Sequence, residues 1–237
     1  MPEPTALALL RIEVDTLWTR DANGRLDRVR VTWKQIAAPY LTVVSGGGGH
    51  FAEVSNAVPV DVARDLAEMV DAHTVDPATG VPEIADVLRG RVDREMGPTT
   101  IGGGPSYVVP AGASYDSGAV IETSTDQDAE ALRGRMPDDD VDGTGGPWAV
   151  AVVDGTVAAM CSTSRRTELG VEAGLWTYAG FRGRGHAAAA TAAWAALFSD
   201  AVVRFYSTAF TNRSSQRVTE RLGLPRLGWT WQLHAAP

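Results

Sequence analysis

A short segment rich in glycine and arginine offers the clearest binding chemistry in this sequence. Arg182-Gly183-Arg184-Gly185-His186-Ala187 follows an apolar run that ends at Thr177 and precedes a stretch of small residues. Glycine lets backbone amides approach a ligand closely, and the first turn of a helix carries unpaired N–H groups at its positive end. These features favour an anion such as a pyrophosphate. A plain chain reversal between a strand and a helix explains the glycines equally, with the arginines facing solvent.

Composition excludes several other chemistries. The chain has 237 residues, a net charge of -8 and a single lysine, Lys34, among 21 basic residues, so a general nucleic-acid binder is not expected. No Gly-Lys-Ser/Thr phosphate loop, activated lysine or G-x-S-x-G elbow occurs. Four scattered histidines and the lone Cys161 give no zinc-ligand spacing, so no metal is expected. The absence of a long apolar run and of a signal peptide predicts a cytoplasmic protein without a membrane partner.

The elements that would position this segment lie in the more regular second part of the chain. We expect a smaller α+β region over residues 1–115 and an α/β domain over 116–237. Asp154-Gly155 between two apolar runs predicts a hairpin. Predicted strands are 41–44, 51–54, 106–109, 120–121, 148–153, 157–162, 169–177, 203–208 and 228–233. Predicted helices are 59–70, 126–135, 185–198 and 214–222. Another helix is expected to begin at Pro82, with Ile84, Val87, Leu88 and Val92 on one face. Residues 137–147 are expected to form an acidic loop.

Two spaced motifs resemble a known family. Arg182-x-x-Gly185-x-Ala187 matches the Q/R-x-x-G-x-G/A signature of the GCN5-related N-acetyltransferases, the GNAT superfamily. Downstream, Asn212 and Ser215 precede a helix that ends in Leu222-Gly223-Leu224, which resembles the second motif of that family. The resemblance covers roughly residues 116–235. It implies a mixed α/β sheet of the GNAT type.

The resemblance also implies where acetyl-CoA would bind. In this family it occupies a V-shaped gap between two parallel strands, here the strand ending at Thr177 and the strand 203–208. Backbone groups of Leu175, Trp176 and Thr177 would pair with the pantetheine as an added strand. The amides of residues 183–187 would hold the pyrophosphate. Asn212 and Ser215 would contact the pantetheine or thioester, although Asn212 or Ser214 equally suits a helix cap. The implied cofactor-binding residues are Leu175, Trp176, Thr177, Arg182, Gly183, Arg184, Gly185, His186, Ala187, Asn212 and Ser215.

The catalytic residues implied by the resemblance are fewer. Glu172 lies on the strand entering the gap, where a carboxylate serves as general base, and it equally suits a surface position on a strand. Thr219 stands where family members often carry a tyrosine as general acid. Tyr206 or Tyr178 would replace it, or water would protonate the thiolate, and Tyr206 also suits a strand core. His186 either contacts a phosphate or sits in an exposed loop. Cys161 is interpreted as a buried hydrophobic residue.

Three functions from different classes remain open at this point. The first is an acetyl-CoA-dependent N-acetyltransferase acting on a small-molecule amine, with residues 1–115 forming a wall of the acceptor pocket. The second is a non-catalytic acyl-CoA-binding sensor or regulator, which the replacement at Thr219 favours. The third is a structural or interaction protein in which the glycines are incidental. A homodimer is compatible with the class, and no residue pattern specifies one.

Overall fold

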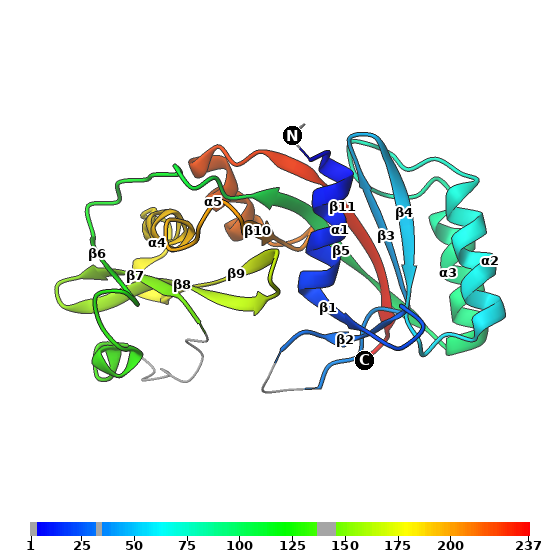
Figure 1. The fold of residues 1–237 in the computed structure, drawn as a ribbon, viewed down its shortest axis with the longest axis horizontal. Helices are drawn as coiled ribbons and strands as arrows, with labels where there is room; N and C mark the ends of the chain where they lie inside the picture. Colours follow the sequence, from blue (N-terminus) through cyan, green and yellow to red (C-terminus); the bar gives the residue numbers. More distant parts are fainter. Residues whose placement is uncertain (1–3, 32–34, 137–145) are drawn as a thin grey trace. The chain divides into compact units, whose positions relative to one another are not determined.

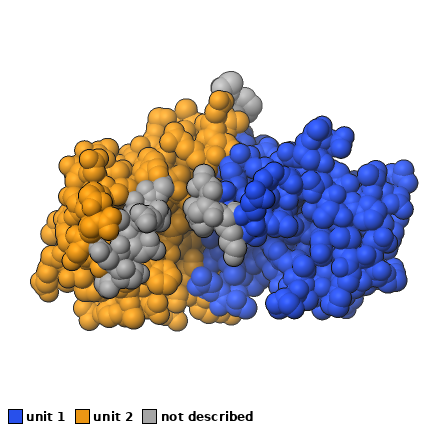
Figure 2. Space-filling view, turned by 90° about the horizontal axis from the view of Figure 1, so that it is seen from below, with its two compact units in different colours: residues 1–106, 207–212, 226–237 blue, residues 107–206, 213–225 orange. Residues whose placement is uncertain are grey.

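The computed structural model describes residues 4–31, 35–136 and 146–237. The chain forms two compact units, which Figure 1 shows as a ribbon and Figure 2 distinguishes by colour. Unit 1 comprises residues 1–106, 207–212 and 226–237, and unit 2 comprises residues 107–206 and 213–225. Lys34 and most of the expected acidic loop 137–147 lie outside the described residues. Within the described ranges, no helix is both long and apolar enough to cross a bilayer.

Unit 1 contains a sheet with the strand order β4-β3-β11-β5. Its strands are β3 (Leu41–Gly46), β4 (Gly49–Val54), β5 (Thr99–Val108) and β11 (Arg226–Ala235), and β1 (Trp18–Arg20) and β2 (Leu26–Val29) form a separate hairpin. Its helices are α1 (Ala6–Leu17), α2 (Val60–Asp71) and α3 (Ala85–Met96). The β3–β4 hairpin was predicted from its apolar runs and is confirmed, with Leu41 opposite Val54.

Alternation along β3 distributes its side chains to two cores. Leu41 and Val43 pack with Trp231 and with helices α2 and α3, whereas Val44 packs with Leu10 of α1. A strand of period two necessarily presents successive side chains to opposite faces of the sheet. The sheet of unit 1 is therefore covered on one face by α2 and α3 and on the other by α1.

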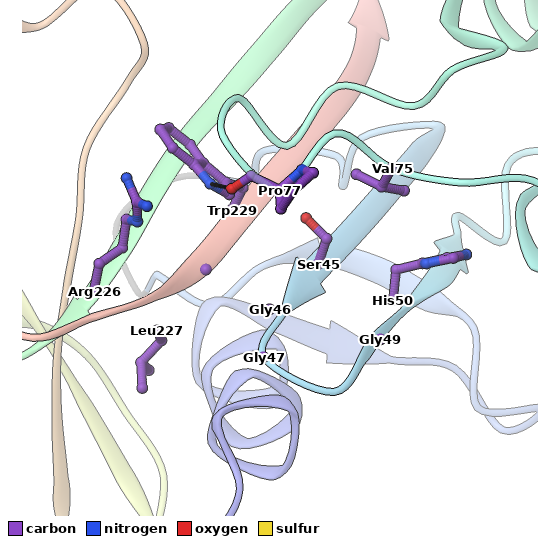
Figure 3. A pocket seen from close by; sticks show the side chains of 11 residues that line it. Ser45, Gly46, Gly47, Gly49, His50, Val75, Pro77, Arg226, Leu227 and Trp229 are labelled. Atoms are coloured by element: carbon purple, nitrogen blue, oxygen red, sulfur yellow. Dashed lines mark hydrogen bonds between the residues drawn. The ribbon is translucent and has the colours of Figure 1, made fainter.

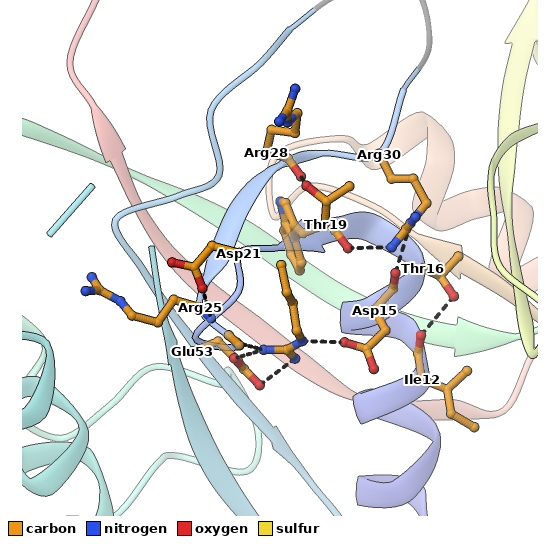
Figure 4. A network of polar contacts seen from close by, with 12 residues as sticks. Ile12, Asp15, Thr16, Thr19, Asp21, Arg25, Arg28, Arg30 and Glu53 are labelled. Carbon is orange, nitrogen blue, oxygen red and sulfur yellow. Dashed lines mark hydrogen bonds and ion pairs between the residues drawn. The ribbon is translucent and has the colours of Figure 1, made fainter. Parts of the chain in front are cut away.

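A polar network fixes the N-terminal helix to its hairpin and to the sheet (Figure 4). Arg20 of β1 donates to Asp15 of α1 at 2.7 Å and to both carboxylate oxygens of Glu53 of β4, at 2.7 and 2.9 Å. The hydrogen bonds to Glu53 and then Asp15 raise the pKa of the Arg20 guanidinium despite its partial burial. Such bidentate pairing is directional as well as electrostatic.

Two expectations for unit 1 differ from the structure. The helix predicted from Pro82 begins at Ala85, and Val87 is 56% exposed, because the buried stripe of α3 is confined to Leu88 and Val92. The expected division at residue 115 assigned the final strand to the second domain. In the structure this strand, β11, pairs antiparallel with β3 from Gly228 to Leu233, so residues 226–237 are part of unit 1.

Unit 2 contains a second run of strands in the order β10-β9-β8-β7-β6. They are β6 (Val120–Thr123), β7 (Trp148–Val153), β8 (Thr156–Arg166), β9 (Gly170–Thr177) and β10 (Val203–Ser207). The helices are α4 (His186–Ala195) and α5 (Arg213–Leu222), with the short 3-10 helices η1 (Ala129–Leu132) and η2 (Ala179–Phe181). The predicted Asp154-Gly155 hairpin joins β7 to β8, and Asp154 adopts a positive φ of 49° there.

The faces of unit 2 are filled by different residue sizes. On one face, Ala149 and Cys161 pack against α4 with Trp194. On the other, Trp148, Val150 and Met160 form a separate cluster with Leu132 of η1. Small residues on the first face allow α4 to approach the sheet closely, which explains the alanines in both elements. A mixed α+β architecture with a large mixed sheet is thus confirmed.

Two helix predictions in unit 2 were wrong in detail. The helix expected over 126–135 is limited to the turn Ala129–Leu132, because the carboxylate of Asp126 instead accepts hydrogen bonds from the N–H and hydroxyl of Thr123. Gly134 has a φ of 72°, which also interrupts a helix. Helix α4 ends at Ala195 rather than at 198, and it is buried on nearly every side rather than along one face.

Candidate acyl-donor site

The parallel strands β9 and β10 part midway along β9. Their register runs from Val203 opposite Gly170 to Phe205 opposite Glu172, and it ends there. On its other side β9 stays paired with β8 as far as Thr177, which lies opposite Ala159. Residues 173–177 of β9 therefore pair with β8 on one side. On the other side they lie beyond the register with β10, and a ligand could pair there in the manner of an added strand.

The loop that follows β9 is shaped by two glycines and held by two arginines. Gly183 and Gly185 have φ values of 80° and 90°, in the region that favours glycine. Arg182 Nε donates to the Thr177 carbonyl at 3.1 Å, and Arg221 of α5 donates to the Gly183 carbonyl at 2.8 Å. Both arginines thus fix the backbone of the loop, and their side chains also contribute positive charge to it.

Helix α4 follows this loop directly and begins without a side-chain cap from the described part of the chain. Gly185 occupies the N-cap in a left-handed conformation, and no side chain within the described ranges caps the helix. Uncapped first-turn amides and the helix dipole together favour a negatively charged group. The loop and the helix start therefore present backbone N–H groups of the kind that a pyrophosphate would accept hydrogen bonds from.

Gly185 and His186 have structural partners that the sequence did not indicate. A Cβ at Gly185 would lie 2.5 Å from Tyr115 Cε1, so glycine is also required here for packing. His186 is 5% exposed and its Nδ1 lies 3.1 Å from Ser117 Oγ, so the alternative of an exposed loop histidine was wrong. Burial, and then the nearby Arg184, lower the pKa of His186.

The remaining predicted cofactor residues differ in exposure and in unit. Trp176, Arg182, Gly183, Arg184 and Asn212 are exposed, whereas Leu175, Thr177, Ala187 and Ser215 are partly buried. Asn212 belongs to unit 1 and directly precedes α5, while Ser215 belongs to unit 2 and lies in the first turn of α5. Trp176 is 53% exposed and packs edge-on against Tyr178.

Glu172 is buried at the point where the two strands part. It is only 2% exposed, so the alternative of a surface carboxylate was wrong. Burial raises the pKa of the nearby Cys161 thiol, and the charge of Glu172 adds to that shift. Burial also lowers the pKa of Arg165, which lies opposite Glu172 in the β8–β9 register, and the Glu172 charge opposes that change. Glu172 is thus a buried carboxylate at the last residue of β9 that is in register with β10, the position for which the resemblance implies a general base.

Both tyrosine candidates for a general acid are buried, and Tyr178 packs in the cluster of Trp148, Val150 and Met160. Tyr206 is 2% exposed, and its hydroxyl lies 2.7 Å from Ser215 Oγ. Burial raises the pKa of Tyr206, only partly opposed by the hydrogen bond to Ser215. The hydroxyl of Thr219 donates to the Gln216 carbonyl within its own helix at 2.7 Å. Tyr206 therefore sits in the core, the alternative that the strand position indicated.

Sequence reasoning missed three residues that shape this site. Tyr115 and Ser117 come from the segment before β6, and Arg221 comes from the last turn of α5. No local pattern marks them, because each acts through a contact distant in sequence. Across the described ranges, no group of three His, Cys, Asp or Glu side chains is arranged to hold a metal ion.

Comparison with known proteins identifies the class of this domain. Residues 110–225 match the family model described as an acetyltransferase (GNAT) domain. This span nearly coincides with unit 2. The C-terminal half of the chain thus carries an acetyltransferase domain of the GNAT superfamily, as its two motifs predicted.

Similar solved structures share low identity with this chain. A GCN5-related N-acetyltransferase from Kribbella flavida is 17% identical with a TM-score of 0.49, over 98% of this chain and 94% of that one. An acetyltransferase of the GNAT family from Novosphingobium aromaticivorans is 23% identical with a TM-score of 0.38, over 58% of this chain and 66% of that one. A GCN5-related N-acetyltransferase-like protein from Streptococcus suis is 16% identical with a TM-score of 0.39, over 83% and 85%. No curated protein matches the sequence.

Proposed function

We propose that this chain is an acetyl-CoA-dependent N-acetyltransferase that modifies a small-molecule amine. The observation that carries the proposal is the parting of β9 from β10 at Glu172, upstream of an uncapped helix start at Gly185. Pantetheine would add along residues 175–177 in the manner of a strand. The pyrophosphate would face the amides of residues 183–187. Acetyl-CoA would supply the acetyl group as an activated thioester.

The described residues support a direct transfer. Glu172 would accept a proton from the amine, directly or through water, as the C–N bond forms and the C–S bond breaks. The backbone N–H of Trp176 or a neighbour would stabilise the oxyanion. Because Tyr206 and Thr219 hydroxyls are both hydrogen-bonded within the fold, water would return the proton to the departing thiolate.

One observation favours a second function, acyl-CoA binding without turnover. Thr219 occupies the position where the family resemblance implies a tyrosine, and its hydroxyl bonds to its own helix. Tyr206 does not offer a ready replacement, because burial raises its pKa and Ser215 holds its hydroxyl. A sensor would retain the donor site and lack the proton transfers.

The test combines binding with a screen of acceptors. Titration calorimetry with acetyl-CoA measures donor binding, and release of free thiol across a panel of small amines measures transfer. Gly183→Glu is the matched loop variant, because nothing lies within 4 Å of a Cβ at Gly183, whereas Gly185→Glu would also collide with Tyr115. The proposal requires saturable donor binding that Gly183→Glu abolishes and at least one amine that releases thiol.

Each other outcome selects a different function. Saturable binding with no acceptor in the panel, and no thiol release above the rate with buffer, supports the sensor. Absence of acetyl-CoA binding by a folded protein eliminates both acyl-CoA functions and leaves the interaction protein. The fold of each variant is checked by circular dichroism.

A further inference from the structure

Unit 1 contains a pocket whose lining includes none of the residues assigned to the acyl donor (Figure 3). It has a volume of about 420 Å³, within the usual range for small-molecule sites. Its walls come from the β3–β4 turn, the segment around Pro77 and the start of β11. All of its lining residues belong to unit 1.

Trp229 forms a fixed wall of this pocket. Its indole Nε1 donates to the Pro77 carbonyl at 3.1 Å, and its ring stacks on Phe210 with 6.0 Å between centroids and 17° between planes. A Cβ on Gly80 would lie 2.1 Å from Trp229 Cβ, so the neighbouring backbone approaches as closely as glycine permits. The wall is therefore preformed, which reduces the entropy cost of binding.

The charge of the pocket favours an anion. Arg226 lines it, with Cζ 4.7 Å from the centroid of the Trp229 ring. Arg226 forms no ion pair with any residue that the structure describes, and the lining includes no Asp or Glu. A guanidinium has the planar geometry that matches a carboxylate through two parallel hydrogen bonds. Although the whole chain has a net charge of -8, the charge of Arg226 makes this pocket locally favourable for the carboxylate of a ligand.

A buried hydroxyl in the pocket is an independent sign of a ligand. Ser45 is 6% exposed, and its Oγ has no hydrogen-bond partner within the described part of the chain. Figure 3 shows this side chain directed toward Pro77 and Trp229, with His50 on the paired strand beside it. Leaving a buried hydroxyl without a partner costs free energy, which a ligand oxygen would recover.

We propose that this pocket binds a small carboxylate with an apolar body. Arg226 would pair with the carboxylate, Ser45 would donate a hydrogen bond to an oxygen of the ligand, and Val75, Pro77, Leu227 and Trp229 would contact its apolar part. None of these residues is assigned to the acyl donor, so binding at the two sites is measured separately.

The test titrates the full chain with phenylacetate and hexanoate, each compared with its neutral primary amide, by ligand-detected NMR. We expect a dissociation constant below about 1 mM for at least one carboxylate and at least tenfold weaker binding of its amide. Arg226→Gln should weaken the carboxylate at least tenfold, Arg226→Lys should weaken it less, and Ser45→Ala should weaken it several-fold. Arg64→Gln removes an exposed arginine of α2 and should change nothing.

Three results would overturn the proposal. The first is the absence of saturable binding of both carboxylates up to about 10 mM. The second is equal affinity for a carboxylate and its amide. The third is an unchanged carboxylate affinity in both Arg226→Lys, which conserves the charge, and Ser45→Ala, which conserves the approximate shape. Acetyl-CoA titration of the same samples reports separately on unit 2, so failure here is distinguishable from failure of the proposed transferase.

Discussion

The hydroxyl of Tyr206 lies 2.7 Å from Ser215 Oγ and 3.3 Å from the Ser215 carbonyl. This pair joins β10 to the first turn of α5 in unit 2. The sequence analysis singled out Tyr206 as a candidate general acid and Ser215 as a candidate contact to acetyl-CoA. The structure places the two side chains next to each other. The contact assigns the Tyr206 hydroxyl to holding α5 in place, since both the hydroxyl and the carbonyl of Ser215 lie within hydrogen-bond distance of it.

Tyr206→Phe should therefore lower stability more clearly than catalysis. Losing a buried hydrogen bond costs about 1 kcal/mol of unfolding free energy, measured by urea denaturation. Catalysis should fall by no more than a few-fold, because the phenol does not supply the proton. A hundredfold loss of kcat in a variant of unchanged stability would instead establish Tyr206 as the acid. Ser215→Ala is the companion variant, and its stability loss should not add to that of Tyr206→Phe.

Glu172→Gln should reduce transfer strongly while retaining donor binding. Removing a general base typically costs 10²- to 10⁴-fold in rate, and glutamine keeps the shape of the buried side chain. The measurement is thiol release at saturating acetyl-CoA, with calorimetry to confirm donor affinity. Glu168→Gln changes an exposed carboxylate in the turn before β9 and serves as the matched control. Equal rates for these two variants would remove Glu172 from the mechanism.

Local patterns predicted the elements well wherever the determinant was itself local. The Asp154-Gly155 turn requires only a positive φ and two apolar flanks, and the structure contains that hairpin. Helix α1 was missed although its signal was present, since Thr5 Oγ1 accepts a hydrogen bond from the N–H of Ala8 as a normal N-cap. The helix predicted over 126–135 does not form in full, because the Asp126 carboxylate accepts a hydrogen bond from the N–H of Thr123 instead of capping the first turn of a helix.

Long-range relationships were beyond local patterns. The pairing of β11 with β3 joins residues near 230 to residues near 43, and no periodicity within either strand specifies its partner. The same limit applies to the site. Gly183 and Gly185 were visible as a loop signature, whereas the contacts of that loop with Arg221 and Tyr115 depend on tertiary packing. Burial of Glu172 likewise follows from the sheet and not from its neighbours in sequence.

The two loop glycines should respond differently to alanine. Both have a positive φ, so each substitution carries a backbone cost of about 1–2 kcal/mol. Only at Gly185 does the new Cβ also approach a ring, that of Tyr115, at 2.5 Å. Gly185→Ala should therefore be more destabilising than Gly183→Ala in thermal unfolding. Combining Gly185→Ala with Tyr115→Ala should recover part of the excess, and strict additivity of the two changes would contradict this explanation.

His186 should make stability depend on pH in one direction. Burial lowers its pKa below the ordinary value of 6.5, so the unfolded chain takes up the proton at a higher pH than the folded one. Unfolding free energy should consequently fall as the pH drops below about 6.5. His186→Gln, which retains a partner for Ser117 and does not titrate, should lose less stability between about pH 7 and pH 5. The exposed His73→Gln should keep the wild-type slope, and an unchanged slope in His186→Gln would refute the prediction.

Arg221 should influence donor affinity through the loop that it holds. Its guanidinium donates to the Gly183 carbonyl at 2.8 Å, so Arg221→Gln releases the loop backbone and removes one positive charge. Losing one hydrogen bond of about 1 kcal/mol to a charged donor should weaken acetyl-CoA about fivefold, measured by calorimetry. Arg217→Gln removes the same charge from an exposed position one turn earlier on α5. If both variants bind acetyl-CoA equally weakly, the loss of one positive charge explains the effect. If only Arg221→Gln binds it more weakly, the hydrogen bond that positions the loop explains the effect.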